Sequence, residues 1–246
     1  MKVLGLDTST TTVTVAVLDA PDAPDAPDLL RGGPTAAGAP APTWQVLAEA
    51  HVHEGNRPAE LLAPTIKQVL AEAGLGPRDL GAVAAGVGPG PFTGLRAGLV
   101  TARALAHVVG VRVHGVCSLD ALHAGVVAAG GPVDAVVTTD ARRREVYWAA
   151  YRDGRRVADP EVGEPASAAA AARTHLVPVV GRGALLYPDV LGTPAEGLPL
   201  DPSAVHVAAL AVASLAGTGP QPLPADPMYL RRPDAREPGA PKRVGG

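Results

Sequence analysis

A short strand, an aspartate, a turn and a second strand follow one another twice in this chain, and this repeated pattern restricts the fold most strongly. In the first copy, the apolar run at residues 3–6 precedes Asp7, a Thr/Ser-rich turn and alternating residues 12–18. In the second copy, residues 133–139 precede Asp140, a charged turn and the alternating residues 145–151. Strands of this kind interspersed with helical segments predict two α/β lobes of related topology.

The 246 residues divide accordingly into two predicted lobes, residues 1–110 and 111–230, followed by a Pro-rich tail at 231–246. Residues 19–43 interrupt the first lobe with Asp-Ala-Pro repeats and a Gly/Ala/Pro tract. Such a composition has few apolar side chains to bury, so we expect a disordered insertion there.

The overall composition argues against direct attraction to polyanions or membranes. The net charge is −3, and 47% of the residues are hydrophobic against 18% charged. No segment reads as a secretory signal or a membrane span, so the expected location is the cytoplasm. Cys117 stands alone in an apolar context and is interpreted as a buried structural thiol.

A glycine-rich stretch, GVGPGPFTGLRAG at residues 86–98, raises the question of phosphate binding. It lacks the lysine of a Walker A motif and the glycine spacing of a dinucleotide fingerprint. Pro89 and Pro91 carry no N–H, which removes two potential anion donors. We therefore interpret the stretch as a loop that leads into a helix and is poorly suited to hold phosphate.

The helix after this loop carries small residues at every fourth position, and these share one face. Two interpretations stand equally: the stripe packs on the protein's own sheet, or it receives a partner helix. The partner interpretation includes the apolar face of the helix that begins near residue 58. The residues assigned to this interface are Leu61, Leu62, Ile66, Val69, Gly94, Leu95, Gly98, Ala102 and Ala106.

Polar candidates for chemistry are few. Asp7, Thr8, Ser9 and Asp140 are candidates for a nucleotide cleft, although Asp7 serves equally well as a turn residue. No metal site is predicted, because His51 and His53 share a strand face but have no visible third ligand.

Five arginines lie at positions 142–144 and 155–156 and could contact RNA phosphates. The simpler alternative is a hairpin whose arginines are only solvated.

Five segments occur in an order that resembles the TsaB (YeaZ) family. They are LGLDTSTTTVTVAVLD, GVGPGPFTGLRAG, CSLDAL, DARRREVYWAAY and PMYLR. The resemblance implies an α/β chain with an actin-like ATPase (ASKHA) fold of two ribonuclease-H-like lobes. Pro91 departs from the family pattern, which has serine there, and this weakens any anion-binding role.

The same resemblance implies a part in making threonylcarbamoyladenosine beside the tRNA anticodon. It implies a non-catalytic subunit without a cofactor of its own, which binds TsaD and works with the ATPase TsaE. The complex then uses ATP through those two partners. A homodimer through the same helices is a further expectation, with tRNA contacted only indirectly and no membrane partner. The alternative is an ATP-dependent phosphotransferase or hydrolase of the actin-like superfamily.

Overall fold

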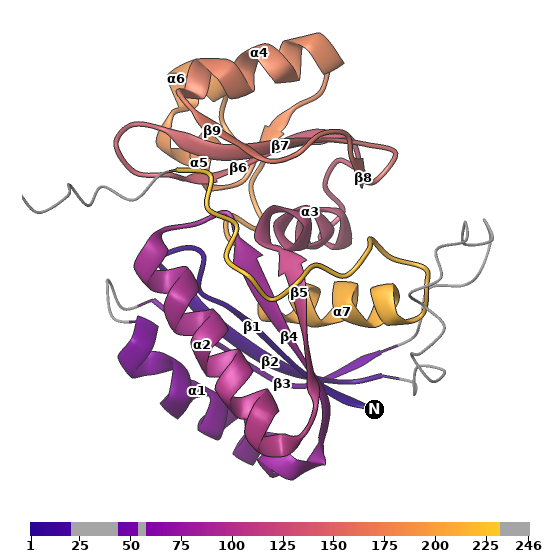
Figure 1. The fold of residues 1–246 in the computed structure, drawn as a ribbon. Coiled ribbons are helices and arrows are strands. Elements are labelled where there is room, and N and C mark those ends of the chain that lie inside the picture. Colours follow the sequence, from indigo (N-terminus) through magenta and orange to yellow (C-terminus); the bar gives the residue numbers. More distant parts are fainter. Residues whose placement is uncertain (21–43, 54–57, 232–246) are drawn as a thin grey trace, which may run out of the picture.

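The computed structural model describes residues 1–20, 44–53 and 58–231 (Figure 1). Most of the predicted insertion at 19–43 and of the tail at 231–246 lies outside these ranges. Two of the insertion's residues are described and are structured: Asp19 ends a strand, and Ala20 is buried.

The first sheet has five strands in the order β3-β2-β1-β4-β5. Only β2 runs antiparallel to its neighbours, since β1 pairs in parallel with β4, and β4 with β5. This is the arrangement of a ribonuclease-H-like lobe. The strands are β1 (Lys2–Asp7), β2 (Val13–Asp19), β3 (Gln45–Val52), β4 (Leu80–Gly88) and β5 (Arg112–Cys117).

The second sheet repeats the central part of the first. β6 pairs antiparallel with β7 and parallel with β10, as β1 does with β2 and β4. Two short strands, β8 and β9, add to β7. The strands are β6 (Ala135–Asp140), β7 (Val146–Arg152), β8 (Arg155–Arg156), β9 (Glu161–Gly163) and β10 (Val179–Val180). The two lobes of related topology are confirmed.

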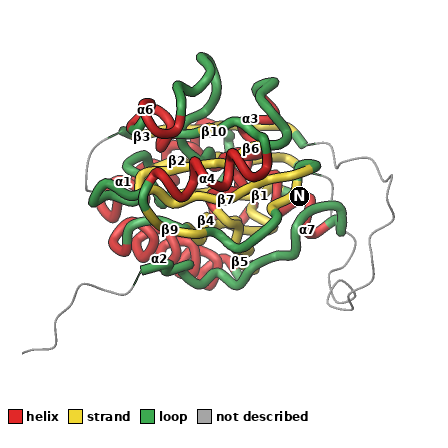
Figure 2. Tube along the Cα trace, turned by 90° about the horizontal axis from the view of Figure 1, so that it is seen from above, coloured by secondary structure: helices red, strands yellow, loops and turns green. Residues whose placement is uncertain are grey.

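Helices cover both sheets. In the first lobe, α1 and α2 pack on one face and α7 on the other, with the short η1 (Pro77–Asp79) leading into β4 (Figure 1). In the second lobe, α4 lies across β6 and β7 (Figure 2), while α3 lies between the lobes. The helices are α1 (Pro58–Glu72), α2 (Phe92–Val109), α3 (Ser118–Ala128), α4 (Pro165–His175), α5 (Arg182–Leu186), α6 (Pro188–Leu191) and α7 (Ala204–Leu215).

The predicted boundary between residues 110 and 111 is wrong in two respects. β5 belongs to the first sheet, and α7 packs on β1, β2 and β4 although it follows the second sheet in the chain. β5 lies in the first sheet because it pairs in parallel with β4. α7 lies on that sheet because its apolar face buries Val207 and Ala208 there. The chain thus leaves the first lobe after β5 and returns to it at α7.

After α7, the chain turns at residues 216–220, and residues 221–231 form an irregular segment, which we call the C-terminal strap. It runs from α7 past β5 to the second lobe, where it passes near α5 (Figure 1). Leu223 pairs with Gly115, and the Met228 N–H donates to the Val87 carbonyl at 2.8 Å. Arg231 then donates to the Ala141 carbonyl at 2.8 Å. The strap therefore makes a third connection between the two lobes.

In the described part of the chain, every helix is too short or too polar to cross a membrane.

Candidate functional site

The turn between β1 and β2 is closed by the carboxylate of Asp7. Its Oδ1 accepts from the Ser9 N–H at 2.7 Å and the Ser9 hydroxyl at 2.6 Å. Its Oδ2 accepts from the Ser118 hydroxyl at 2.6 Å. The side chain is 1% exposed, and burial raises the pKa of Asp7 above its ordinary value of 3.8, against the lowering effect of these hydrogen bonds. Both carboxylate oxygens are thus engaged inside the protein.

The glycine-rich loop packs directly on this turn. A side chain at Gly86 would overlap the Asp7 carboxylate, and one at Gly90 would lie 2.5 Å from the Ser9 carbonyl oxygen. The Gly88 N–H donates to Ser118 at 3.1 Å. The glycines are therefore needed for close approach to the chain's own backbone, which supports the interpretation that this loop is no phosphate cradle.

An arginine–aspartate pair connects the two lobes beside this turn. Arg182, at the start of α5, donates from Nε to Oδ1 of Asp201 at 2.7 Å and from Nη2 to Oδ2. The bond with Asp201 raises the pKa of Arg182, and the charge of Asp140 acts in the same direction. Asp201 in turn contributes to the raised pKa of Asp7. The charges of one internal ion pair, Arg182–Asp201, therefore act on the two predicted cleft aspartates, and no sequence pattern indicates this pair.

Asp7 offers a test of this internal role. Replacing Asp7 by alanine should destabilise the fold by about 1–3 kcal/mol for each buried donor left without an acceptor. Replacing it by asparagine keeps the size and removes the charge. Because the folded-state pKa is raised, the stability difference between wild type and Asp7→Asn should fall as the pH rises from 3.8 and level off above the folded-state pKa.

Urea unfolding between pH 3 and 8 would measure this difference, with the exposed Asp189→Asn as the control. A difference that rises with pH would contradict the assignment, because it would mean that the fold favours the ionised form.

The small-residue stripe of α2 faces this same turn. A side chain at Gly94 would overlap the Thr8 carbonyl, and one at Gly98 would overlap the Thr8 hydroxyl. That hydroxyl donates to the Gly94 carbonyl at 2.8 Å. Of the two interpretations left open, packing on the protein's own structure is therefore the correct one.

The predicted interface residues are correspondingly unavailable to a partner. Leu61 is partly buried, and the others are buried within the chain itself: Leu62, Ile66, Val69, Gly94, Leu95, Gly98, Ala102 and Ala106. In the chain by itself these residues are occupied by internal packing, because periodicity identifies a helix face without identifying what it meets.

The opposite side of α2 carries a second set of small and apolar residues. Val100 and Val108 are 64% and 82% exposed, and Ala104 lies between them on the same side. Ala63 and Pro64 are exposed on α1, which packs beside α2. We call the set Ala63, Pro64, Ala97, Val100, Ala104 and Val108 the outer face of α1–α2.

The two strand histidines have protein partners. His51 lies 3.5 Å from Glu49, and His53 Nδ1 lies 2.8 Å from the Thr12 hydroxyl. Among the described residues, no group of three or more His, Cys, Asp or Glu side chains could hold a metal ion.

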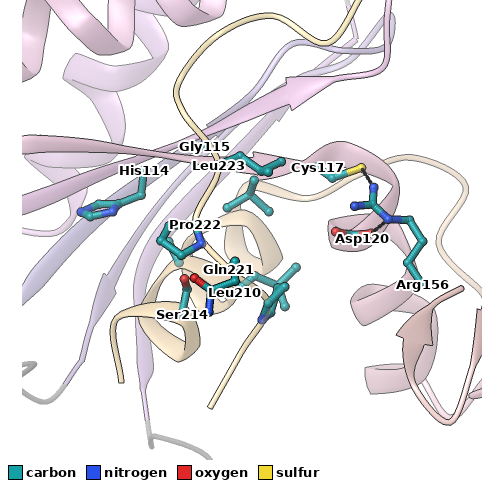
Figure 3. Close-up of a pocket in the computed structure, with 13 residues that line it drawn as sticks. His114, Gly115, Cys117, Asp120, Arg156, Leu210, Ser214, Gln221, Pro222 and Leu223 are labelled. Atoms are coloured by element: carbon teal, nitrogen blue, oxygen red, sulfur yellow. Dashed lines mark hydrogen bonds and ion pairs between the residues drawn. The ribbon is translucent and has the colours of Figure 1, made fainter. Parts of the chain in front are cut away.

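A cavity of about 160 Å³ opens elsewhere, between β5, α7 and the C-terminal strap (Figure 3). Cys117 lies on its wall and is 1% exposed, and burial raises the pKa of this thiol to about 12. Arg156 donates to its sulfur at 3.1 Å and pairs with Asp120, which also accepts from Tyr151 at 2.6 Å. A thiol of such high pKa is a poor nucleophile, in keeping with a structural thiol.

Fold and site together define the class: an actin-like (ASKHA) α/β protein with two ribonuclease-H-like lobes. YeaZ from Pseudomonas aeruginosa superposes with a TM-score of 0.68 and 25% identity, over 93% of this chain and 99% of that one. A second P. aeruginosa structure is described as an uncharacterized protein with similarity to peptidase YeaZ. It superposes with a TM-score of 0.67 and 26% identity, over 94% of this chain and 99% of its own. The chain belongs to the TsaB (YeaZ) family.

Sequence comparisons agree with this family. A model described as TsaD, tRNA N6-adenosine threonylcarbamoyltransferase, matches residues 55–179. An uncharacterized protein of Mycobacterium tuberculosis is 42% identical, over 78% of this chain and 83% of its own length. An uncharacterized Mycobacterium leprae protein is 44% identical over 77% of this chain, which spans about half (49%) of that relative. The Escherichia coli tRNA threonylcarbamoyladenosine biosynthesis protein TsaB is 35% identical, over 37% of this chain and 39% of its own.

Proposed function

We propose that this chain is a non-catalytic subunit that binds a TsaD-type transferase and enables threonylcarbamoyl transfer to tRNA, with TsaE joining the complex in the cytoplasm. The family takes part in threonylcarbamoyladenosine biosynthesis, for which three of its relatives are named. The observation that carries the proposal is the engagement of Asp7: Ser9 and Ser118 occupy both oxygens of the aspartate that ends β1.

The groups around the β1–β2 turn support the same proposal. A nucleotide-using enzyme needs carboxylates that can reach a cation or water, and oxyanion donors that can reach phosphate. Here the loop at residues 86–90 is seated on the β1–β2 turn, and Asp201 is paired with Arg182. The loop and the turn thus engage each other within the first lobe, while the Arg182–Asp201 pair joins the two lobes.

The outer face of α1–α2 is the surface we assign to the transferase. The TsaD model matches residues 55–179, so a TsaD-type partner has a counterpart to this helix pair. Two such pairs can pack face to face, because small residues such as Ala104 permit close approach of the helices. Val100 and Val108 would then supply the apolar area that is buried.

The test is reconstitution with the TsaD and TsaE homologues encoded by the same genome. We expect threonylcarbamoyladenosine, measured by mass spectrometry of tRNA nucleosides, to form at a much higher rate when this chain is present. The chain alone should neither modify tRNA nor hydrolyse ATP.

Two outcomes would contradict the proposal. One is transfer that is equally fast without this chain. The other is ATP hydrolysis by the isolated chain that Asp7→Asn abolishes, which would favour the enzyme alternative; the matched Asp189→Asn variant should leave any such activity unchanged.

A further inference from the structure

The turn between β6 and β7 has an unusual backbone. Arg142, Arg143 and Arg144 have φ angles of 61°, 56° and 62°, so three consecutive arginines adopt the left-handed conformation. The left-handed conformation is unfavourable for residues with a Cβ, and glycine or asparagine usually occupies it. All three arginines are exposed, so burial of their side chains does not offset this cost.

The turn is nevertheless held firmly. Asp140 accepts from the Arg142 N–H at 2.7 Å, and the Glu145 N–H donates to the Arg142 carbonyl at 3.0 Å. From the strap, Arg231 donates to the Ala141 carbonyl and forms an ion pair with Glu145. The fold therefore fixes the backbone of a short loop that carries three exposed arginines.

The local charge contrasts with that of the whole chain. Four arginines (142, 143, 144 and 231) stand against two carboxylates (Asp140 and Glu145), a net charge of +2 in a chain of net charge −3. This turn thus carries a local excess of positive charge that the net charge of the chain does not reflect.

An exposed aromatic ring lies close by along the strap. Tyr229, two residues before Arg231, is 37% exposed and stacks on Phe92 with ring centroids 4.2 Å apart. Arg96 donates to its hydroxyl at 2.9 Å and lies 5.8 Å from the ring centroid. Guanidinium groups beside an aromatic ring are the side chains that contact phosphates and bases in RNA complexes.

We propose that this turn, residues 142–144, binds the phosphate backbone of tRNA beside the strap residue Tyr229, with Arg231 holding the turn in place. Planar guanidinium groups donate to phosphate oxygens in pairs, and a loop with a fixed backbone loses little entropy on binding. The turn presents no apolar side chain outward, which favours RNA over a protein partner. The proposal rests on the proposed function for its substrate class, and it departs from the expectation that tRNA is contacted only indirectly.

The test variant is Arg143→Asn with Arg144→Asn, because asparagine tolerates the left-handed backbone and removes two charges. The matched control is Arg78→Gln with Arg173→Gln, which removes two exposed arginines elsewhere. Fluorescence anisotropy of the full chain, alone and with the transferase subunit, would use a labelled tRNA transcript with adenosine after the anticodon.

We expect the test variant to bind this tRNA at least tenfold more weakly than wild type at low salt. The plot of log K against log salt should become shallower: the magnitude of its negative slope should decrease by about 1 to 2, because two phosphate contacts are lost. The control should bind as wild type does, and both variants should keep the wild-type melting temperature.

Three results would overturn the inference: no tRNA binding by wild type, equal binding by the test variant and wild type, or equal weakening in the control. Loss of affinity for the transferase subunit with unchanged tRNA binding would instead assign the turn to a protein contact. Transferase binding and tRNA binding are measured separately, so failure of the proposed function and failure of this inference are distinguishable.

Discussion

Gly98→Leu is expected to destabilise the protein by about 1–3 kcal/mol, because the new side chain must displace Thr8 at the junction of α2 and the β1–β2 turn. Loss of the hydrogen bond from Thr8 to Gly94 adds about 1 kcal/mol. The higher helix propensity of leucine stabilises the variant by about 1 kcal/mol, which is too little to make the substitution stabilising overall. Urea unfolding monitored by circular dichroism would measure the change.

Ala104→Leu is the matched control, since it adds a leucine to the exposed side of the same helix. Its stability should remain within about 0.5 kcal/mol of wild type. A Gly98→Leu protein as stable as wild type, but unable to bind the transferase, would show that the stripe faces a partner after all.

Val100→Glu combined with Val108→Glu is expected to weaken binding to the TsaD homologue at least tenfold, about 1.4 kcal/mol. Both side chains are largely exposed, so the charges cost little in the free chain. In a packed helix interface they would be removed from water without partners, which is unfavourable. Titration calorimetry would give the affinity.

The control for this pair is Val133→Glu with Val157→Glu, which adds the same charges at exposed sites of the second lobe. It should bind as wild type does. Unchanged affinity of the Val100/Val108 variant would exclude the outer face of α1–α2 from the interface. Size-exclusion chromatography of both variants would show whether a homodimer uses the same face.

Much of the first lobe could be predicted because its elements carry strong local signals. β1 and β4 are buried apolar runs, and α1 has a clear apolar face. Gly74 and Gly110 follow α1 and α2 with φ angles of 69° and 84°, a backbone that favours glycine.

The second lobe gave weaker signals. Helix α4 has the sequence PASAAAAARTH, in which the buried face consists of alanines such as Ala168 and Ala172. Alanines on both faces of a helix leave no periodic contrast, so the segment was not predicted as a helix. The short strands β8 and β9 depend on pairing with β7, which no local pattern indicates.

The amino-acid sequence by itself determined the duplicated strand–turn–strand units, the family and the absence of a nucleotide-binding loop motif. Only the tertiary structure decided what each face meets. Thr8 and Gly94 are 86 residues apart, Asp7 and Ser118 are 111 apart, and Arg182 meets Asp201 where the two lobes join. A helical repeat of small residues defines a surface, but the element packed on that surface is set by how the whole lobe folds. For this reason the sequence predicted a helix pair as the partner surface, and the burial seen in the structure led us to propose the opposite side of that pair.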